Sequence, residues 1–140
     1  MKTLSDISIP HPFPYQGSKR GIAGYILPHV PSDVRCLVEP FCGSAAVSIA
    51  AAALGLARQF WLNDLNKPLM DLWTEILERP NELIEDYEKL WNDQHRNRKE
   101  FFYRIRDEFN QSHQPRHLLY LLARIVKGSV RYSANGSFNQ

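Results

Sequence analysis

Two short apolar runs, separated by a small-residue loop and an alanine-rich segment, restrict the possible folds of this chain more than any other feature. Residues 34–40 (VRCLVEP) and 58–64 (RQFWLND) are nearly continuous apolar runs, as expected of strands that are buried on both faces. Between them, residues 44–56 (SAAVSIAAAALGL) favour a helix that stops near Gly55. The order strand, loop, helix, strand predicts the opening unit of a doubly wound parallel sheet. Two strands cannot form such a sheet alone, so either further strands come from elsewhere or the chain is not the whole functional unit.

The rest of the chain predicts helices and one hairpin. Prolines among the first fifteen residues indicate an irregular arm, and residues 17–31 predict a helix with Ser18 as its N-cap. Further helices are expected at about residues 66–79, 81–91, 98–110 and 116–128. Residues 129–140 (SVRYSANGSFNQ) predict a hairpin around the turn pair Asn135-Gly136.

Composition is that of an ordinary single-domain protein. The chain has 140 residues, of which 44% are hydrophobic and 23% charged, and a formal net charge of +2. This mildly basic balance is compatible with a nucleic-acid partner without requiring one. Cys36 and Cys42 are too few for a disulfide framework and lack the spacing of a metal site. No segment has the pattern of a signal peptide or a membrane span, so we expect a soluble, cytoplasmic protein that does not contact a membrane.

The loop of residues 41–45 follows the first predicted strand, at the edge where open α/β sheets bind ligands. Gly43 lets a ligand approach the backbone, and the amides at the start of the next helix favour a polar or anionic group. Asp64 ends the second predicted strand, where a carboxylate can accept both hydroxyls of a ribose. Together these residues predict a cofactor that contains adenosine. Taken singly, Gly43 is compatible with a structural turn and Asp64 with a helix N-cap.

Four ordered segments resemble a known family. Residues 13–31 (FPYQGSKRGIAGYILPHVP), 38–50 (VEPFCGSAAVSIA) and 63–66 (NDLN) resemble the opening motifs of Dam-type adenine-specific DNA methyltransferases. Residues 127–140 (KGSVRYSANGSFNQ) are similar to the target-recognition hairpin of that family. The residues that match are Tyr15, Gly17, Ser18 and Lys19 in the first motif, Glu39, Pro40, Phe41 and Gly43 in the second, and Asn63, Asp64 and Asn66 in the third.

The resemblance implies an α/β fold, which is a partial Rossmann-like fold of the S-adenosylmethionine-dependent methyltransferases. This fold would carry a helical and hairpin DNA-recognition segment, and a partner chain would complete it. Residues 1–66 would form the cofactor-binding half of the methyltransferase domain. Residues 67–140 would form the helical insert and the recognition hairpin. The implied reaction is methyl transfer from S-adenosylmethionine to the exocyclic amine of a flipped adenine in double-stranded DNA.

Two departures from the family pattern qualify this expectation. Ala45 stands where the family's loop has a second glycine, and because alanine is also small, we expect cofactor binding to survive. The family's Asp/Asn-Pro-Pro-Tyr/Phe motif, which holds the target amine, is missing, and the sequence has no Pro-Pro pair. Family order places this motif and the remaining strands after Gln140. We therefore expect one subunit of a split enzyme whose second subunit carries the motif. The alternatives are a truncated chain, a degenerate gene, a non-catalytic cofactor- or DNA-binding regulatory module, and half of an RNA methyltransferase.

The resemblance assigns most cofactor contacts to the two loops that follow the strands. Phe41 would pack against S-adenosylmethionine, and Gly43 and Ser44 would lie against its methionine portion. Asp64 would take the ribose, and Leu65 would lie beside the adenine.

Three further residues are assigned to the cofactor, each with an alternative. Tyr15 and Lys19 would close the pocket, with Lys19 paired to the cofactor carboxylate. The alternatives are an aromatic anchor of the proline-rich arm for Tyr15 and a solvated helix residue for Lys19. Glu39 would contact the cofactor or, with equal weight, would be a buried acid that caps nearby amides.

The hairpin and the helix before it carry the residues that the resemblance assigns to DNA, which are Lys127, Arg131, Tyr132 and Asn135. Basic groups there can contact phosphates, and Arg131 can read a guanine edge. The alternative for these basic residues is a solvated face. No residue of this chain is assigned a catalytic role, and the five histidines show no metal-ligand spacing.

Overall fold

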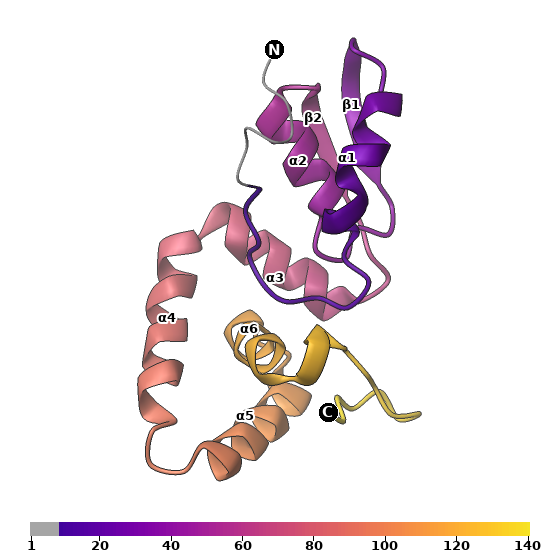
Figure 1. Cartoon of the computed structure of the whole chain (residues 1–140). Coiled ribbons are helices and arrows are strands. Elements are labelled where there is room, and N and C mark those ends of the chain that lie inside the picture. The colour runs from indigo at the N-terminus through magenta and orange to yellow at the C-terminus, as the bar shows by residue number, and fades with distance from the viewer. Residues whose placement is uncertain (1–8) are drawn as a thin grey trace. The chain divides into compact units, whose positions relative to one another are not determined.

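The computed structural model describes residues 9–140, which form two compact units (Figure 1). Within the described residues, the first unit contains residues 9–12 and 17–65. The second unit contains Phe13–Gln16 and Asn66–Gln140. A short piece of the first sequence motif, which includes Tyr15, therefore belongs to the second unit.

The first unit is built on two parallel strands, β1 (Val34–Glu39) and β2 (Ala57–Leu62). Helix α2 (Ala46–Leu54) connects them. It ends as predicted at Gly55, whose φ of 69° lies in the left-handed region that glycine adopts without steric cost. The strand, helix and parallel strand confirm that the chain is α/β and opens as the sequence predicts.

A series of short helical turns precedes the sheet. It consists of η2 (Lys19–Ile22), α1 (Ala23–Ile26) and η3 (Leu27–His29), which occupy the segment predicted as one helix. The hydroxyl of Ser18 accepts a hydrogen bond from the Arg20 N–H, which confirms the predicted N-cap.

Helices cover one face of the two-stranded sheet. α1, η3 and α2 contribute a cluster of buried alanine and leucine side chains, and Leu37 and Phe60 pack against it. These two residues are register partners and so lie on the same face. Val38 and Trp61, the next pair, lie on the opposite face and are 56% and 69% exposed. The prediction of strands buried on both faces is therefore wrong for the described residues, because the helices of this unit gather around α2.

The second unit is helical and confirms the helices predicted after the sheet. Its members are α3 (Lys67–Glu78), α4 (Pro80–Asp93), α5 (Arg98–Ser112) and α6 (Pro115–Arg124). α6 packs against the other three, and its apolar stripe supplies the buried Leu118, Leu121 and Leu122. No helix within residues 9–140 combines the length and the apolar character needed to cross a membrane.

The last helix ends earlier than predicted. After α6 the backbone of Ile125 is extended, with φ of −75° and ψ of 148°. Lys127 and Gly128 then both have φ of 59°, in the left-handed region. As a result Val126 is 79% exposed, and the expectation of a helix up to residue 128 is wrong over its last turn.

The predicted hairpin is present and is closed by one antiparallel bridge, between Tyr132 and Phe138. The Ser133 N–H donates to the Ser137 carbonyl at 2.8 Å, and the Gly136 N–H donates to the Ser133 carbonyl at 2.9 Å. The φ of Gly136 is 82°. The turn therefore begins at Ser133, before the Asn-Gly pair that predicted it.

Candidate functional site

The loops that follow β1 and β2 meet at the carboxyl edge of the sheet. The Gly43 N–H donates to Asp64 Oδ2 at 3.0 Å, and the Cys42 N–H donates to the Asn63 carbonyl at 2.8 Å. The Asn63 N–H donates in turn to the Glu39 carbonyl at 3.0 Å. The second and third sequence motifs are thus joined directly, because the carboxyl ends of neighbouring parallel strands share one edge.

The first motif reaches the same loop through a pair of serine hydroxyls. Ser44 Oγ donates to Ser18 Oγ at 2.8 Å, and the Ser44 side chain is buried. Ser18 also caps η2. Ser44 is a predicted site residue, whereas Ser18 is predicted as an N-cap within the first motif, and nothing local in the sequence indicates that these two hydroxyls meet.

Glu39 lies beneath the loop and binds the start of α2. Its Oε2 accepts hydrogen bonds from the Ser48 N–H at 3.1 Å and from Ser48 Oγ at 2.6 Å. Ser48 lies in the first turn of α2, where unpaired amides and the helix dipole favour a carboxylate. Of the two interpretations of Glu39, the structure shows the capping one, and a contact with a cofactor stays a prediction.

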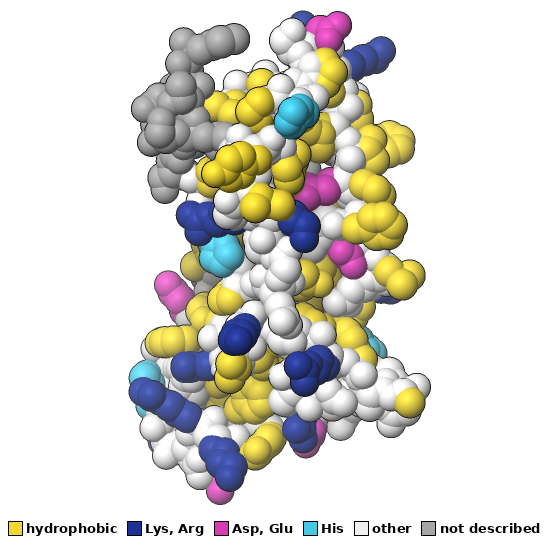
Figure 2. Space-filling model, turned by 45° about the vertical axis from the view of Figure 1, so that its right-hand side comes forward, with side chains coloured by type: hydrophobic (Ala, Val, Ile, Leu, Met, Phe, Trp, Pro, Cys, Tyr) yellow, Lys and Arg dark blue, Asp and Glu magenta, His cyan; other side chains and the backbone are white. Residues whose placement is uncertain are grey.

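The two loops that hold the half-buried Asp64 and Gly43 also carry two large exposed apolar side chains. Phe41 follows β1 and is 85% exposed, and Leu65 follows β2 and is 95% exposed. In the space-filling view, yellow hydrophobic side chains lie on the surface of the first unit, with a few magenta carboxylates among them (Figure 2). A carboxylate on loops that also carry exposed apolar groups suits a ligand with hydroxyls beside an aromatic ring. The residues present therefore fit an adenosine moiety.

The loop after β1 contains two left-handed residues. Gly43 and Ala45 both have φ of 49°. Glycine adopts this conformation freely, whereas alanine pays about 1–2 kcal/mol because its Cβ approaches the following carbonyl oxygen. Ala45 is fully buried, and its N–H donates to the Cys42 carbonyl at 2.7 Å. Packing therefore holds a strained residue where the family's loop has a glycine.

Replacing Ala45 with glycine should be nearly neutral for stability. The lost methyl group and the freer unfolded chain together cost about 1–2 kcal/mol, and the released strain returns a similar amount. Ala46→Gly is the matched control, because Ala46 is also buried but is helical, so its loss of about 1–2 kcal/mol has no compensation. Denaturant unfolding of both variants measures the difference, and equal losses would show that Ala45 is not strained.

Cys42 lies in the same loop and is buried. Burial, followed by the nearby carboxylates of Asp64 and Glu39, raises the pKa of its thiol to about 11. The thiol therefore stays protonated at neutral pH, which does not suit a nucleophile.

The two remaining candidates from the first motif are placed separately. Lys19 is exposed, and its Nζ donates to the Gly17 carbonyl at 3.0 Å. Tyr15 belongs to the second unit, where its ring lies 6.2 Å from that of Phe13 in an edge-to-face arrangement. The ring contact is that of an aromatic anchor, and the cofactor roles of both residues stay predictions.

The four residues assigned to DNA divide into two kinds. Lys127 and Arg131 are exposed. Tyr132 is half-buried, and its hydroxyl donates to Asn66 Oδ1 at 3.1 Å. Asn135 Oδ1 accepts the Ser137 N–H at 3.1 Å and the Ser133 hydroxyl, so it holds the turn. The two cations are presented to solvent, whereas the other two side chains stabilise the hairpin.

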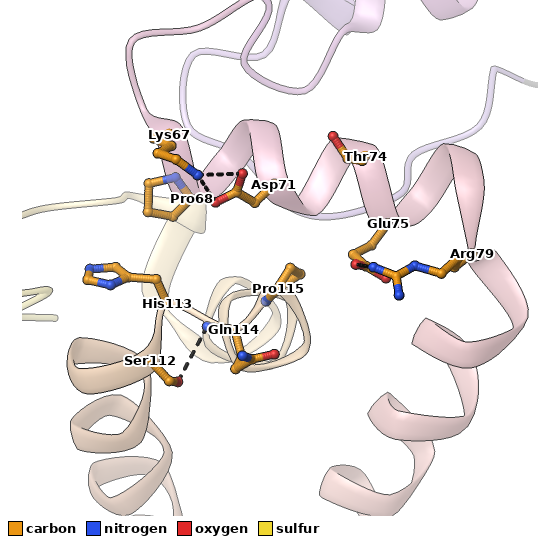
Figure 3. Close-up of a pocket in the computed structure, with 10 residues that line it drawn as sticks. All are labelled: Lys67, Pro68, Asp71, Thr74, Glu75, Arg79, Ser112, His113, Gln114 and Pro115. Atoms are coloured by element: carbon orange, nitrogen blue, oxygen red, sulfur yellow. Dashed lines mark hydrogen bonds and ion pairs between the residues drawn. The ribbon is translucent and has the colours of Figure 1, made fainter.

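A surface pocket in the second unit lies between α3 and the turn that joins α5 to α6 (Figure 3). It is lined by Lys67, Pro68, Asp71, Thr74, Glu75, Arg79, Ser112, His113, Gln114 and Pro115. Its charged side chains neutralise one another, since Lys67 pairs with Asp71 at 2.7 Å and Arg79 pairs with Glu75. None of the residues assigned from the sequence lines this pocket, and no group of metal ligands occurs within residues 9–140.

Comparison with known proteins finds one family and several relatives. Residues 15–140 match the model of the D12 class N6 adenine-specific DNA methyltransferases. The chain is 30% identical over 129 residues to a DNA adenine methylase of Serratia marcescens and to one of Escherichia coli strain K12. It is 31% identical over 131 residues to the Retron Ec67 DNA adenine methylase of Escherichia coli. Each match covers 89% of this chain and 44–46% of the relative, so the chain spans about half the length of these relatives.

Proposed function

This chain belongs to the D12 class N6 adenine-specific DNA methyltransferase family, and from that premise we propose that it supplies the cofactor-binding half of a DNA adenine methyltransferase. The reaction transfers a methyl group from S-adenosylmethionine to the exocyclic amine of adenine in DNA. When bound, S-adenosylmethionine supplies the reactive methyl group. The observation that carries the proposal is the hydrogen bond between Gly43 and Asp64, because it joins two of the family's motifs at the ligand-binding edge of the sheet.

Asp64 has two roles in the proposed cofactor site. It accepts the ribose hydroxyls and it keeps the Gly43 amide in place. These roles are compatible, because a carboxylate has about four lone-pair positions. Phe41 and Leu65 bury apolar surface against the adenosine, at about 25 cal/mol per Å². Gly43 and Ser44 lie against the methionine portion.

Lys19, Glu39 and Tyr15 support this site in different ways. The long side chain of Lys19 can turn from the Gly17 carbonyl and pair with the cofactor carboxylate. Glu39 acts through Ser48, since its carboxylate fixes the start of α2 under the loop. The contribution of Tyr15 is proposed from its place in the first motif alone.

The hairpin is the proposed DNA-recognition element. Its cations, Lys127 and Arg131, are exposed and would contact a phosphate and a guanine edge respectively. Tyr132 and Asn135 keep the hairpin in shape through their bonds to Asn66 and within the turn. Recognition by this element therefore depends on the two cations for contact and on the two neutral side chains for geometry.

We propose that a second subunit carries the Asp/Asn-Pro-Pro-Tyr/Phe motif that holds the target amine. The 140 residues contain no Pro-Pro pair. The sheet face with Val38 and Trp61 is exposed, and neighbouring exposed apolar side chains are typical of interaction surfaces. Both observations support completion of the fold and of the site by residues other than these 140.

The DNA part of the proposal predicts different effects for the two cations. Lys127→Ala should weaken binding to all DNA sequences alike. It should also make the binding constant depend less steeply on salt concentration, by about the contribution of one phosphate contact. Arg131→Ala should also weaken binding and should relax specificity at one base pair by about 1–3 kcal/mol. Fluorescence anisotropy with adenine-containing duplexes of varied sequence, at several salt concentrations, measures both effects.

Lys89→Ala provides the control for the charge change. Lys89 is an exposed lysine of α4 that pairs with Asp86, and its loss lowers the net charge by the same amount. Its replacement should leave DNA affinity almost unchanged. If Lys127→Ala and Arg131→Ala behave like this control, the hairpin is not the recognition element.

A further inference from the structure

The second unit contains two chain segments that lead directly into the proposed cofactor site. Phe13–Gln16 runs into the first motif, and Asn66 directly follows Leu65. A contact that fixes these segments limits how far the cofactor loops can move. The segment Gly128–Tyr132, which we call the hairpin base, contacts both of them.

Gly128 holds the first segment. Its carbonyl accepts the Gln16 N–H at 3.0 Å. A Cβ at this position would lie 2.5 Å from the carbonyl carbon of Pro14 and 2.7 Å from the nitrogen of Tyr15. Its φ of 59° also disfavours other residues. Glycine is therefore required here by its conformation and by the close approach of the backbone.

Tyr132 holds the second segment, through the hydrogen bond from its hydroxyl to Asn66 Oδ1 at 3.1 Å. Burial raises the pKa of Tyr132, so the hydroxyl keeps its proton at neutral pH. Asn66 precedes the first residue of α3, and its carbonyl accepts the N–H groups of Leu69 and Met70 at 3.0 and 3.1 Å. The hairpin base is thus bonded to the residue at which the third motif enters α3.

The hairpin base is itself anchored on α5. The ring of Tyr132 lies 6.0 Å from that of the buried Phe138, and Phe138 lies 5.8 Å from Phe109. Asn110 binds the backbone of Phe138 twice, with its Oδ1 accepting the N–H at 2.7 Å and its Nδ2 donating to the carbonyl at 3.1 Å. These contacts join the Tyr132 ring to the buried side chains of the second unit.

We infer that Gly128 and Tyr132 are positioning residues that couple DNA binding to cofactor binding, an inference that rests on the function proposed above. Arg131, the proposed DNA contact, lies within the hairpin base. DNA that fixes Arg131 also fixes the segment that holds Gln16 and Asn66, so the cofactor loops lose less conformational entropy when the cofactor binds. By linkage, the cofactor raises the affinity for DNA by the same factor.

The test measures the dissociation constant of the full chain for an adenine-containing duplex, with and without S-adenosylmethionine. In the native chain the cofactor should raise the affinity for DNA by about 5- to 150-fold, which is the range typical of coupled sites. Tyr132→Phe removes only the hydroxyl and should bring the ratio of the two dissociation constants close to one. Gly128→Ala should do the same, because it forces the backbone of Pro14 away. The control Tyr103→Phe removes an exposed tyrosine hydroxyl of α5 and should keep the native ratio.

Amide hydrogen exchange of the ligand-free chain gives an independent readout. Tyr132→Phe should raise exchange in residues 63–70 and 13–20 and leave α5 unchanged. An unchanged affinity ratio in Tyr132→Phe overturns the coupling even if exchange rises. If the native chain binds both ligands without any coupling, the inference fails and the proposed function stands. If the native chain binds neither ligand even after the candidate second polypeptide is added, both fail.

Discussion

Replacing Asp64 with alanine should weaken S-adenosylmethionine binding by about 1–3 kcal/mol, or about 5- to 150-fold. Two losses contribute to this effect. The ribose hydroxyls lose a charged acceptor, and the Gly43 N–H loses the carboxylate oxygen that it contacts at 3.0 Å. The loop after β1 is then tied less firmly to the loop after β2, so the site is also less well organised before the cofactor arrives.

One further variant separates the charge of Asp64 from its geometry, and a second variant is a control. Asp64→Asn keeps a side-chain oxygen for Gly43 but lacks the charge, so its affinity should lie between those of native Asp64 and Asp64→Ala. Asp33→Ala removes an exposed carboxylate from the turn before β1 and should leave the affinity unchanged. Calorimetric titration measures the affinity, and thermal unfolding confirms that each variant is folded. Native-like affinity in Asp64→Ala would exclude Asp64 from the cofactor site.

The order and the pairing of elements in the first unit follow from local sequence patterns. The apolar runs, the alanine-rich helix and Gly55 each specify their own conformation, and a short crossover through α2 brings β1 and β2 together in parallel. The burial of the two strands was predicted less well. An apolar run indicates which faces a strand buries when all of its neighbouring elements are in place. Val38 and Trp61 lie on the face opposite the one that the helices described in the first unit cover.

The candidate site was predictable where its residues come from strand ends. Parallel strands share a carboxyl edge, so the motifs around Gly43 and Asp64 are expected to meet, and they do so through hydrogen bonds that include the one from the Gly43 N–H to Asp64. The bond from Tyr132 to Asn66 joins residues far apart in the sequence, and no local pattern encodes it. Asn135 is the opposite case. The Asn135-Gly136 pair is typical of a turn, and the hydrogen bonds that Asn135 makes within the turn follow from that local pattern.

The second prediction with a large expected effect concerns activity. This chain alone should transfer no detectable methyl group to adenine-containing duplex DNA, because it lacks the motif that would hold the target amine. It should also self-associate, since within residues 9–140 β1 and β2 each leave an unpaired strand edge beside an exposed apolar face. Adding a candidate polypeptide that carries the Asp/Asn-Pro-Pro-Tyr/Phe motif should restore both solubility and methyl transfer. The assay follows transfer of a labelled methyl group with each polypeptide alone and with the two combined.

The exposed sheet face gives this complementation a specific structural requirement. Trp61→Glu places a charge where the second polypeptide would bury an aromatic ring, so it should weaken association by roughly 2 kcal/mol or more and reduce the restored activity. Tyr25→Glu is the matched control, because Tyr25 is 79% exposed but belongs to α1, on the side of the sheet that the helices already cover. Equal effects of the two variants would argue against the Val38 and Trp61 face as the interface. Methyl transfer by this chain alone would show that the amine is held by other residues. Inactivity in the presence of a well-folded candidate would instead favour a regulatory or degenerate member of the family.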